Sequence, residues 1–589
     1  MARRFLLLAV GVGLLAGTLG CHQWFLDEAD REVKQLIESR QQAALGETHP
    51  VDIGSETGDL AKTDDMYRFV PHPVDSRVPD AFQAATAPRD EPEEMSVEDD
   101  ITSQPATSPD RQAQVFTLAD CLAYAQGYAR ELQTAKEDLY LSALALSLER
   151  HLWTPRFSGG TSFEFADYGQ VRDFDRAMTA IAQLAVEQQL PYGGTVTARI
   201  IDAWMRDLKV HTTSGETGQM ILEADIPLLR GAGRVAYESR YQAERDLIYA
   251  VRGFERFRRE FLVDIASDYF RLLSLLAQIE SAQAQVTSLA GVRDEAQAKV
   301  KVDYKDSLRI EADRARVEYL SAQNRVVSAL ETYDSALDRF KIRLGMSTES
   351  PIELAGEDIA LYEPDVVERE AVATALKYRL DLLNTLDSVD DARRGVQVAR
   401  NNLLPDFDFS GSVGMNTDPD KPDTLQYNTE RTTWRGMLEL EIPLDRKEER
   451  NQVRSAWIDL RRAERRYDEF ADQVRAEVRR AIRQITLART SLAIQAERVV
   501  INEFRAAQAA ALLDTGKARS TRDKVEAEND LRDARNAYAN ARADYRRTIL
   551  EFLLASGTLR VGDDGRWVTF QDAAAGAFTP PPEPPDAPD

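Results

Sequence analysis

Residues 405–415 read Pro-Asp-Phe-Asp-Phe-Ser-Gly-Ser-Val-Gly-Met, a run in which apolar and polar side chains alternate. One face carries Phe407, Phe409, Val413 and Met415, and the other carries Asp408, Ser410 and Ser412. A period of two is that of a half-buried β-strand. Such a strand suits a barrel wall between lipid and water, but it equally suits an antiparallel sheet on a soluble core, so both remain open at this point.

The same alternation occurs in residues 434–442, with Met437 as the exception, and in residues 163–165 and 222–226. Four prolines bracket these segments: Pro155, Pro227, Pro405 and Pro443. Proline cannot donate a hydrogen bond to a helix or to a sheet, so it is well placed where one ends and the other begins. We therefore expect helix–sheet junctions at all four positions.

Long helical segments follow the second proline of each pair. Apolar residues from Val453 to Leu492, and again from Leu247 to Ile279, step mostly by three and four, which is heptad spacing. The segment from Gly233 to Val302 contains almost no helix breaker and predicts a rod of roughly 100 Å. A rod of this length must pack laterally against others, as a coiled-coil hairpin or as staves of a tube.

The chain also contains an internal repeat. Tyr128-Ala129-Arg130-Glu131-Leu132 recurs as Tyr378-Arg379-Leu380-Asp381-Leu382, and Ile226-Pro227-Leu228 recurs as Ile442-Pro443-Leu444. The first half is longer between its prolines, and the surplus contains a further alternating pair around Pro191-Tyr192-Gly193-Gly194. Two extra strands would preserve the up-down order, but an elaborated loop is also allowed.

The two ends of the chain differ from this repeat. A signal peptide is predicted by Arg3, Arg4 and an apolar run to Leu19. The sequence Thr18-Leu19-Gly20-Cys21 resembles a lipobox, which would lead to lipidation of Cys21. Ordinary signal-peptide cleavage and an uncleaved membrane anchor are the alternatives. Neither this run nor any later stretch reaches the length of a transmembrane helix, so we expect integral membrane structure to be β. A short amphipathic helix with Val33, Leu36 and Ile37 on one side is interpreted as solvated near the anchor.

Domain boundaries follow from these patterns. We expect a signal peptide at 1–20; anchor, short helix and disordered acidic leader at 21–114; a first repeat at 115–346; a connector at 347–366; a second repeat at 367–558; and a C-terminal segment with a Pro-rich tail at 559–589.

Composition excludes several functions. The net charge of -25 argues against nucleic-acid binding, which needs clustered Lys and Arg. The five histidines show no metal-ligand spacing, and no phosphate-binding loop, dinucleotide turn or nucleophile elbow is present. We therefore expect no enzymatic activity, no metal and no cofactor. Cys121 is interpreted as a small core residue.

Taken in order, these features resemble the TolC family of outer-membrane efflux and export factors, in its lipoprotein branch, from about Phe116 to Leu559. The resemblance rests on the duplicated Tyr128 and Tyr378 segments, on Leu403-Leu404-Pro405-Asp406-Phe407, and on the strand exit at residues 224–233, which has Ile226 where the family usually has Gln. Residues 525–531 are similar to the family's return helix.

The resemblance implies an α+β membrane protein. Duplicated strand pairs contribute to a trimeric transmembrane β-barrel, four strands from each copy, and long antiparallel coiled-coil helices continue it as a periplasmic α-helical barrel. It implies an outer-membrane location, a homotrimer and two partners, a periplasmic adaptor and an inner-membrane transporter. Opening would require the helix ends to untwist at the periplasmic mouth.

Two sets of candidate site residues follow. The helix tips that would meet a partner are Asp303, Tyr304, Lys305, Asp306 and Ser307, which lack the expected Gly, and Gly516, Lys517, Ala518, Arg519 and Ser520. A plain solvated turn is the alternative for both. If the apolar strand face meets lipid, the lumen receives Glu164, Glu223, Asp225, Asp408, Glu439 and Glu441, which would make a mildly cation-preferring pore unless that face is merely solvated.

The leading hypothesis is a passive duct through which an energised pump moves its cargo. The alternative is a periplasmic lipoprotein scaffold whose coiled-coil hairpins tether envelope components and form no pore. Neither the cargo nor the pump follows from the sequence.

Overall fold

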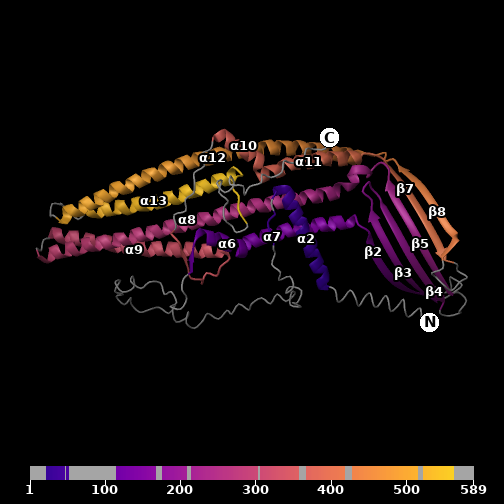
Figure 1. Cartoon of the computed structure of the whole chain (residues 1–589), viewed down its shortest axis with the longest axis horizontal. Helices are drawn as coiled ribbons and strands as arrows, with labels where there is room; N and C mark the ends of the chain where they lie inside the picture. The colour runs from indigo at the N-terminus through magenta and orange to yellow at the C-terminus, as the bar shows by residue number, and fades with distance from the viewer. Residues whose placement is uncertain are drawn as a thin grey trace.

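The computed structural model describes residues 22–46, 48–51, 114–167, 176–207, 214–302, 306–356, 367–417, 427–514 and 522–562. The predicted signal peptide, Cys21, most of the acidic leader and the Pro-rich tail lie outside these residues. So do Asp303, Tyr304 and Lys305 of the first tip and residues 516–520 of the second. The molecule is elongated, with a sheet at one end and long helices running away from it (Figure 1).

The sheet has six strands in the order β2-β3-β4-β5-β7-β8, and every neighbouring pair is antiparallel. The strands are β2 (Arg156–Asp167), β3 (Arg176–Gln189), β4 (Thr195–Asp207), β5 (Ser214–Pro227), β7 (Asp406–Thr417) and β8 (Tyr427–Glu441). The surplus of the first half is therefore a pair of strands, β3 and β4, within the sheet. It is not a loop outside it.

Four long helices form the shaft. They are α8 (Glu238–Val302), α9 (Asp306–Leu344), α12 (Lys447–Asp514) and α13 (Arg522–Ala555), and a 3-10 turn at Gly233–Tyr237 precedes α8. With 65 residues, α8 extends about 98 Å. They lie side by side in the order α9, α8, α13, α12 (Figure 1). Among the described helices, none is both long and apolar enough to cross a bilayer.

Shorter helices lie beside the long ones along the half of the shaft nearer the sheet (Figure 1). They are α6 (Leu118–Tyr128), α7 (Arg130–Leu152), α10 (Glu368–Tyr378) and α11 (Leu380–Asn401). Next to the sheet the lateral order is α7, α8, α11, α12. The pairs α6–α7 and α10–α11 are the two copies of the repeat seen in the sequence.

The main hydrophobic core lies midway along the rods, where α8 and α9 meet the shorter helices. Tyr269, Phe270 and Phe340 are completely enclosed there. A small parallel sheet of β1 (Gln114–Phe116) and β6 (Ile352–Leu354) closes this region, and the sequence analysis did not predict it. Cys121 is buried in the same core, and burial, aided by the charge of Asp120, raises the pKa of its thiol to about 12.

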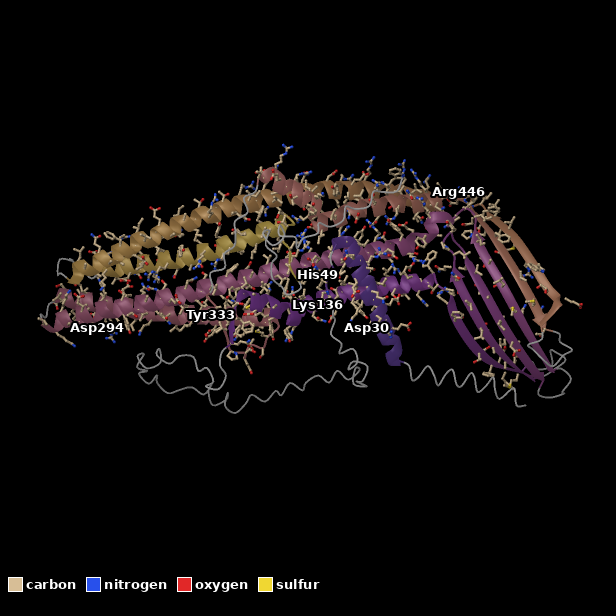
Figure 2. All side chains as sticks on the ribbon, in the orientation of Figure 1. Asp30, His49, Lys136, Asp294, Tyr333 and Arg446 are labelled. Carbon is tan, nitrogen blue, oxygen red and sulfur yellow. The ribbon has the colours of Figure 1, made fainter. Side chains whose placement is uncertain are left out.

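The prediction of a solvated N-terminal helix was wrong. In α2 (His22–Leu45) the side chains of Val33, Leu36 and Ile37 are buried against α7 and α8. Polar contacts reinforce the packing, since the Tyr140 hydroxyl donates to Asp30 and Arg40 pairs with Glu244. Figure 2 shows Asp30 on this helix, which crosses the rods.

The start of the segment predicted as disordered leader is also packed. His49 lies 3.1 Å from the guanidinium of Arg258, and Val51 is buried. Gln114, predicted as the end of the leader, is the first residue of β1. The apolar and charged partners of these residues lie far away in the sequence, so local composition did not reveal them.

Candidate functional site

The sheet presents one apolar face that nothing in the described part of the chain covers. The strand register places on it Phe157, Leu184, Ile200, Leu222, Phe409, Leu438 and Trp434. Phe157 is 82% exposed and Trp434 78% exposed. The strands contact one another and pack no helix against their faces. An apolar surface of this extent marks an interaction with lipid or with protein.

The opposite face is polar. The register places on it all six predicted lumen residues, Glu164, Glu223, Asp225, Asp408, Glu439 and Glu441. Two cross-strand ion pairs lie on the same face, Arg156 with Glu187 at 2.9 Å and Arg199 with Glu223 at 3.1 Å. Arg435 falls on this face as well, but the acidic groups outnumber the three arginines, so the described part of the face carries net negative charge.

The separation of the faces has exceptions. Ile181, Ile221 and Met437 fall on the polar face, and in the middle of β4 two neighbouring residues exchange faces. Ile201 falls on the polar face, and Asp202 falls on the apolar face between Ala182 and Gly218 of the neighbouring strands.

The four prolines lie at helix–sheet junctions. Pro155 separates α7 from β2, Pro227 ends β5, Pro405 precedes β7, and Pro443 lies between β8 and α12. At each of these positions the missing N–H of proline removes no hydrogen bond from a helix or from the sheet.

Hydrogen bonds join the junctions of the two repeats. The N–H of Leu228 donates to Phe407 O at 2.7 Å, and the N–H of Gly231 donates to Asn401 Oδ1 at 2.7 Å. Arg446 donates to the carbonyls of Leu403 and Pro443, both at 3.0 Å, and Figure 2 shows it beside the sheet. The rods and strands are thereby fixed to one another at the end of the shaft.

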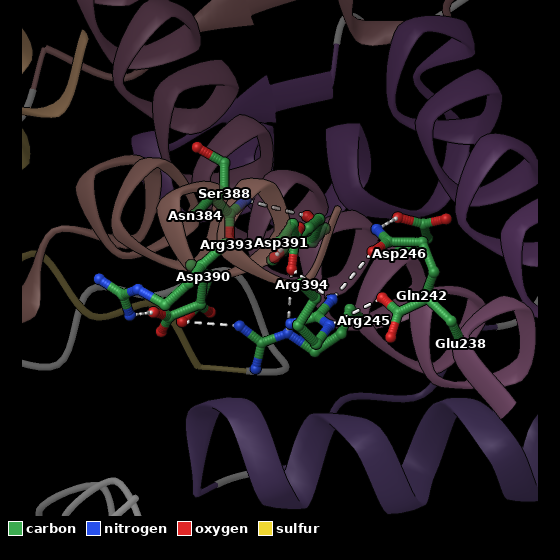
Figure 3. Close-up of polar contacts among 12 residues, drawn as sticks. Glu238, Gln242, Arg245, Asp246, Asn384, Ser388, Asp390, Asp391, Arg393 and Arg394 are labelled. Atoms are coloured by element: carbon green, nitrogen blue, oxygen red, sulfur yellow. Dashed lines mark hydrogen bonds and ion pairs between the residues drawn. The ribbon is translucent and has the colours of Figure 1, made fainter. Parts of the chain in front are cut away.

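A polar network joins α8 to α11 below this junction (Figure 3). Asp387 accepts from Arg252 at 2.6 Å and pairs with Arg245 at 2.7 Å, and Arg394 pairs with Glu238 at 2.8 Å. Burial opposes the charge of Arg245, but the hydrogen bond and charge of Asp387 outweigh it and raise the pKa of Arg245.

Tyr249 completes this network. Its hydroxyl donates to Asp391 at 2.6 Å, and burial together with this bond raises its pKa. The charged groups of this network pair with one another. Such an arrangement stabilises the contact between α8 and α11 and is not that of an acid–base catalytic site. Within the described residues no cluster of His, Cys, Asp and Glu could hold a metal ion.

The two outer helices of the shaft each expose an apolar seam. We call α12 residues Leu487, Ile494, Ile501 and Phe504 the α12 seam, and α9 residues Ile310, Val317, Leu320 and Val327 the α9 seam. Their spacing of three and seven places each set on one side of its helix. The opposite sides are buried against α13 and α8.

The helix breaks predicted as tips lie at the end far from the sheet. The first falls between Val302 and Asp306, and the second between Asp514 and Arg522 (Figure 1). Of the predicted tip residues, only Asp306 and Ser307 are described, and both are exposed at the start of α9.

The described residues thus combine a bundle of long helices with a sheet at one end that has one apolar and one polar face. Residues 371–558 match the family model described as outer membrane efflux protein. The match confirms the predicted resemblance to TolC-type factors, non-enzymatic conduits of the outer membrane with a large helical part on the periplasmic side. No curated protein matches the chain in sequence.

Solved channels share the fold. The CmeC outer membrane channel of Campylobacter jejuni is 16% identical with a TM-score of 0.58, over 80% of this chain and 94% of that one. The open state of the MtrE channel of Neisseria gonorrhoeae is 13% identical with a TM-score of 0.56, over 80% and 97%. The outer membrane protein VceC of Vibrio cholerae is 14% identical with a TM-score of 0.56, over 75% and 96%.

Proposed function

We propose that three copies of this chain form a passive conduit of an efflux or secretion system, leading from the periplasm to the exterior. The observation that carries the proposal is the sheet, which has one apolar face, one acidic face and two open edges. A sheet with open edges cannot lie in a bilayer, because its unpaired backbone groups find no water there. Closure with other copies removes the edges.

The directions of the edge strands allow this closure. In a six-stranded antiparallel sheet the edge strands β2 and β8 run in opposite directions. β8 of one copy can therefore pair with β2 of the next in an antiparallel ladder, and the ring contains no parallel mismatch.

The helices have their free sides at the same two edges. β2, α7 and α9 lie on one side of the molecule, and β8 and α12 lie on the other, so the α9 seam of one copy faces the α12 seam of the next. Pairing two apolar heptad seams buries side chains that are otherwise in water. The same three-fold rotation therefore pairs the edge strands and the two apolar seams at once. This favours a ring of three copies over helical hairpins that act separately.

In this assembly the apolar face meets lipid and the acidic face lines the lumen. The six acidic residues then give a mild preference for cations. The described helix ends at Val302, Asp306, Asp514 and Arg522 lie at the end of the shaft far from the sheet (Figure 1). We place the docking of a periplasmic adaptor and an inner-membrane pump at the predicted tips that follow these ends in the sequence, residues 303–307 and 516–520. Lipidation of Cys21 would add an anchor in the outer membrane.

Assembly and conductance test the proposal together. Detergent-solubilised protein is expected to run as a heat-modifiable trimer and to conduct ions in a planar bilayer. A water-soluble, elongated monomer after removal of residues 1–21 would overturn the conduit and support the scaffold instead.

A further inference from the structure

The hairpin of β3 and β4 is built into the wall of the sheet. β3 pairs with β2 along twelve residues, from Arg156↔Glu187 to Asp167↔Arg176, and β4 pairs with β5 over a similar length. Through these ladders β2 and β5 are separated by two full strands. The hairpin continues both faces as well, since Leu184 joins the apolar side and Glu187 the polar side.

The turn of this hairpin is fitted to the junction beneath the sheet. Gly193 and Gly194 have φ values of 104° and 89°, which favour glycine. The N–H of Gly233, at the start of the rod, donates to Tyr192 O at 2.8 Å. A side chain on Gly193 would collide with Pro227 and the carbonyl of Gly231. The turn thus touches the strand exit of β5 and cannot swing away from the wall.

We propose that the trimer closes an eighteen-stranded barrel to which each copy contributes six strands. In this barrel β3 and β4 are strands of the wall and widen the lumen. This inference rests on the proposed trimeric conduit and specifies its bore. It departs from the four strands per copy that the sequence resemblance implies.

The width of the shaft supports this number of strands. Eighteen strands about 4.8 Å apart and tilted by about 40° form a ring roughly 36 Å across, whereas twelve would form one of roughly 24 Å. Next to the sheet each copy contributes α7, α8, α11 and α12, and twelve helices about 9 Å apart form a ring roughly 34 Å across. With the extra hairpin the barrel matches the tube beneath it, so the exit is not a constriction. Selection by size then falls to the tube and its periplasmic mouth.

Electron cryomicroscopy of the full chain in nanodiscs tests the inference directly. A trimer with eighteen strands in one closed wall is the expected result. A trimer with twelve wall strands and the hairpins outside would overturn the wide barrel while leaving the conduit intact. A particle without three-fold closure would overturn the proposed function itself.

Thiol labelling provides a second measurement with a matched control. Thr197→Cys places a thiol on the polar face between Glu187 and Glu223, and Ala198→Cys places one on the apolar face between Val186 and Leu222. In liposomes, a charged, membrane-impermeant maleimide should label position 197 at least about tenfold faster than position 198, because lipid covers the latter. The parent chain is measured alongside, since its buried Cys121 reacts slowly. Equal labelling of the two positions would show both faces in water and overturn the inference.

Discussion

Gly194 lies directly against the backbone of Asp225, so that a Cβ atom at residue 194 would overlap the carbonyl oxygen of Asp225. The contact holds the turn of the inserted hairpin against the end of β5. It requires both the absence of a side chain and a positive φ, which only glycine adopts without strain.

Gly194→Ala should therefore destabilise the protein by about 1–3 kcal/mol through strain, and by more if the turn has to move. Thermal unfolding in detergent measures the effect. Gly395→Ala is the matched control, because Gly395 lies within α11 and an added Cβ would meet open space, so alanine there should stabilise by up to about 1 kcal/mol. Equal melting temperatures of the two variants would show that the turn is not held at this contact.

The α12 seam predicts where the copies meet. Ile494→Asp places a charge in the middle of an apolar interface and should dissociate the trimer while each chain keeps its helices. Light scattering gives the mass and circular dichroism the helix content. A trimeric Ile494→Asp protein would place the interface elsewhere.

The acidic sheet face predicts ion selectivity. Replacing both Glu439 and Glu441 by Gln removes two charges per copy from the proposed lumen and should move the reversal potential under a salt gradient toward zero. The double replacement by Asp retains the charge and should leave the selectivity in place. Anion preference in the unmodified channel would refute the assignment of this face to a cation-preferring lumen.

Much of the architecture follows from short-range patterns. Alternation at Phe407 and Phe409 predicts β7, heptad spacing predicts the rods, and the repeat of Tyr128 at Tyr378 predicts two equivalent short helices. These three predictions succeed because the periodicity of apolar residues and helix propensity are local properties of the sequence.

The features that the sequence analysis missed depend on contacts between distant residues. Val33 and Ile37 indicate an amphipathic helix, but an apolar stripe does not show whether it meets water, membrane or α7. In the sequence Asp387 is indistinguishable from a solvated helix residue, because its partner Arg252 belongs to α8 and is distant along the chain. The strands β1 and β6 have three residues each, too few to show a period. The strand register that makes the hairpin part of the wall has no sequence signal of its own.

A buried charge cluster beside the N-terminal segment predicts acid sensitivity. Glu255 is 1% exposed and lies 2.9 Å from Arg258 and 2.7 Å from Arg259, with His49 at 4.0 Å. Burial disfavours its carboxylate, but the charges of Arg259, Arg258 and His49 outweigh burial and lower its pKa. A carboxyl group with a lowered folded-state pKa stabilises the protein above its unfolded value of 4.5, and this stabilisation is lost as the pH falls through the folded pKa.

Glu255→Gln should consequently cost about 3 kcal/mol at pH 7, because the buried Arg258 and the partly buried Arg259 lose the anion that they share. Below pH 4.5 the difference in melting temperature between the parent and this variant should shrink, because the unfolded parent then takes up a proton at Glu255, and it should vanish below the lower folded-state pKa. Glu464→Gln is the control: its ion pair with Arg461 is exposed, and its loss should cost at most about 1 kcal/mol. A difference between parent and Glu255→Gln that stays constant from pH 7 to pH 3 would mean that shape, and not the charge of Glu255, holds the N-terminal segment against α8.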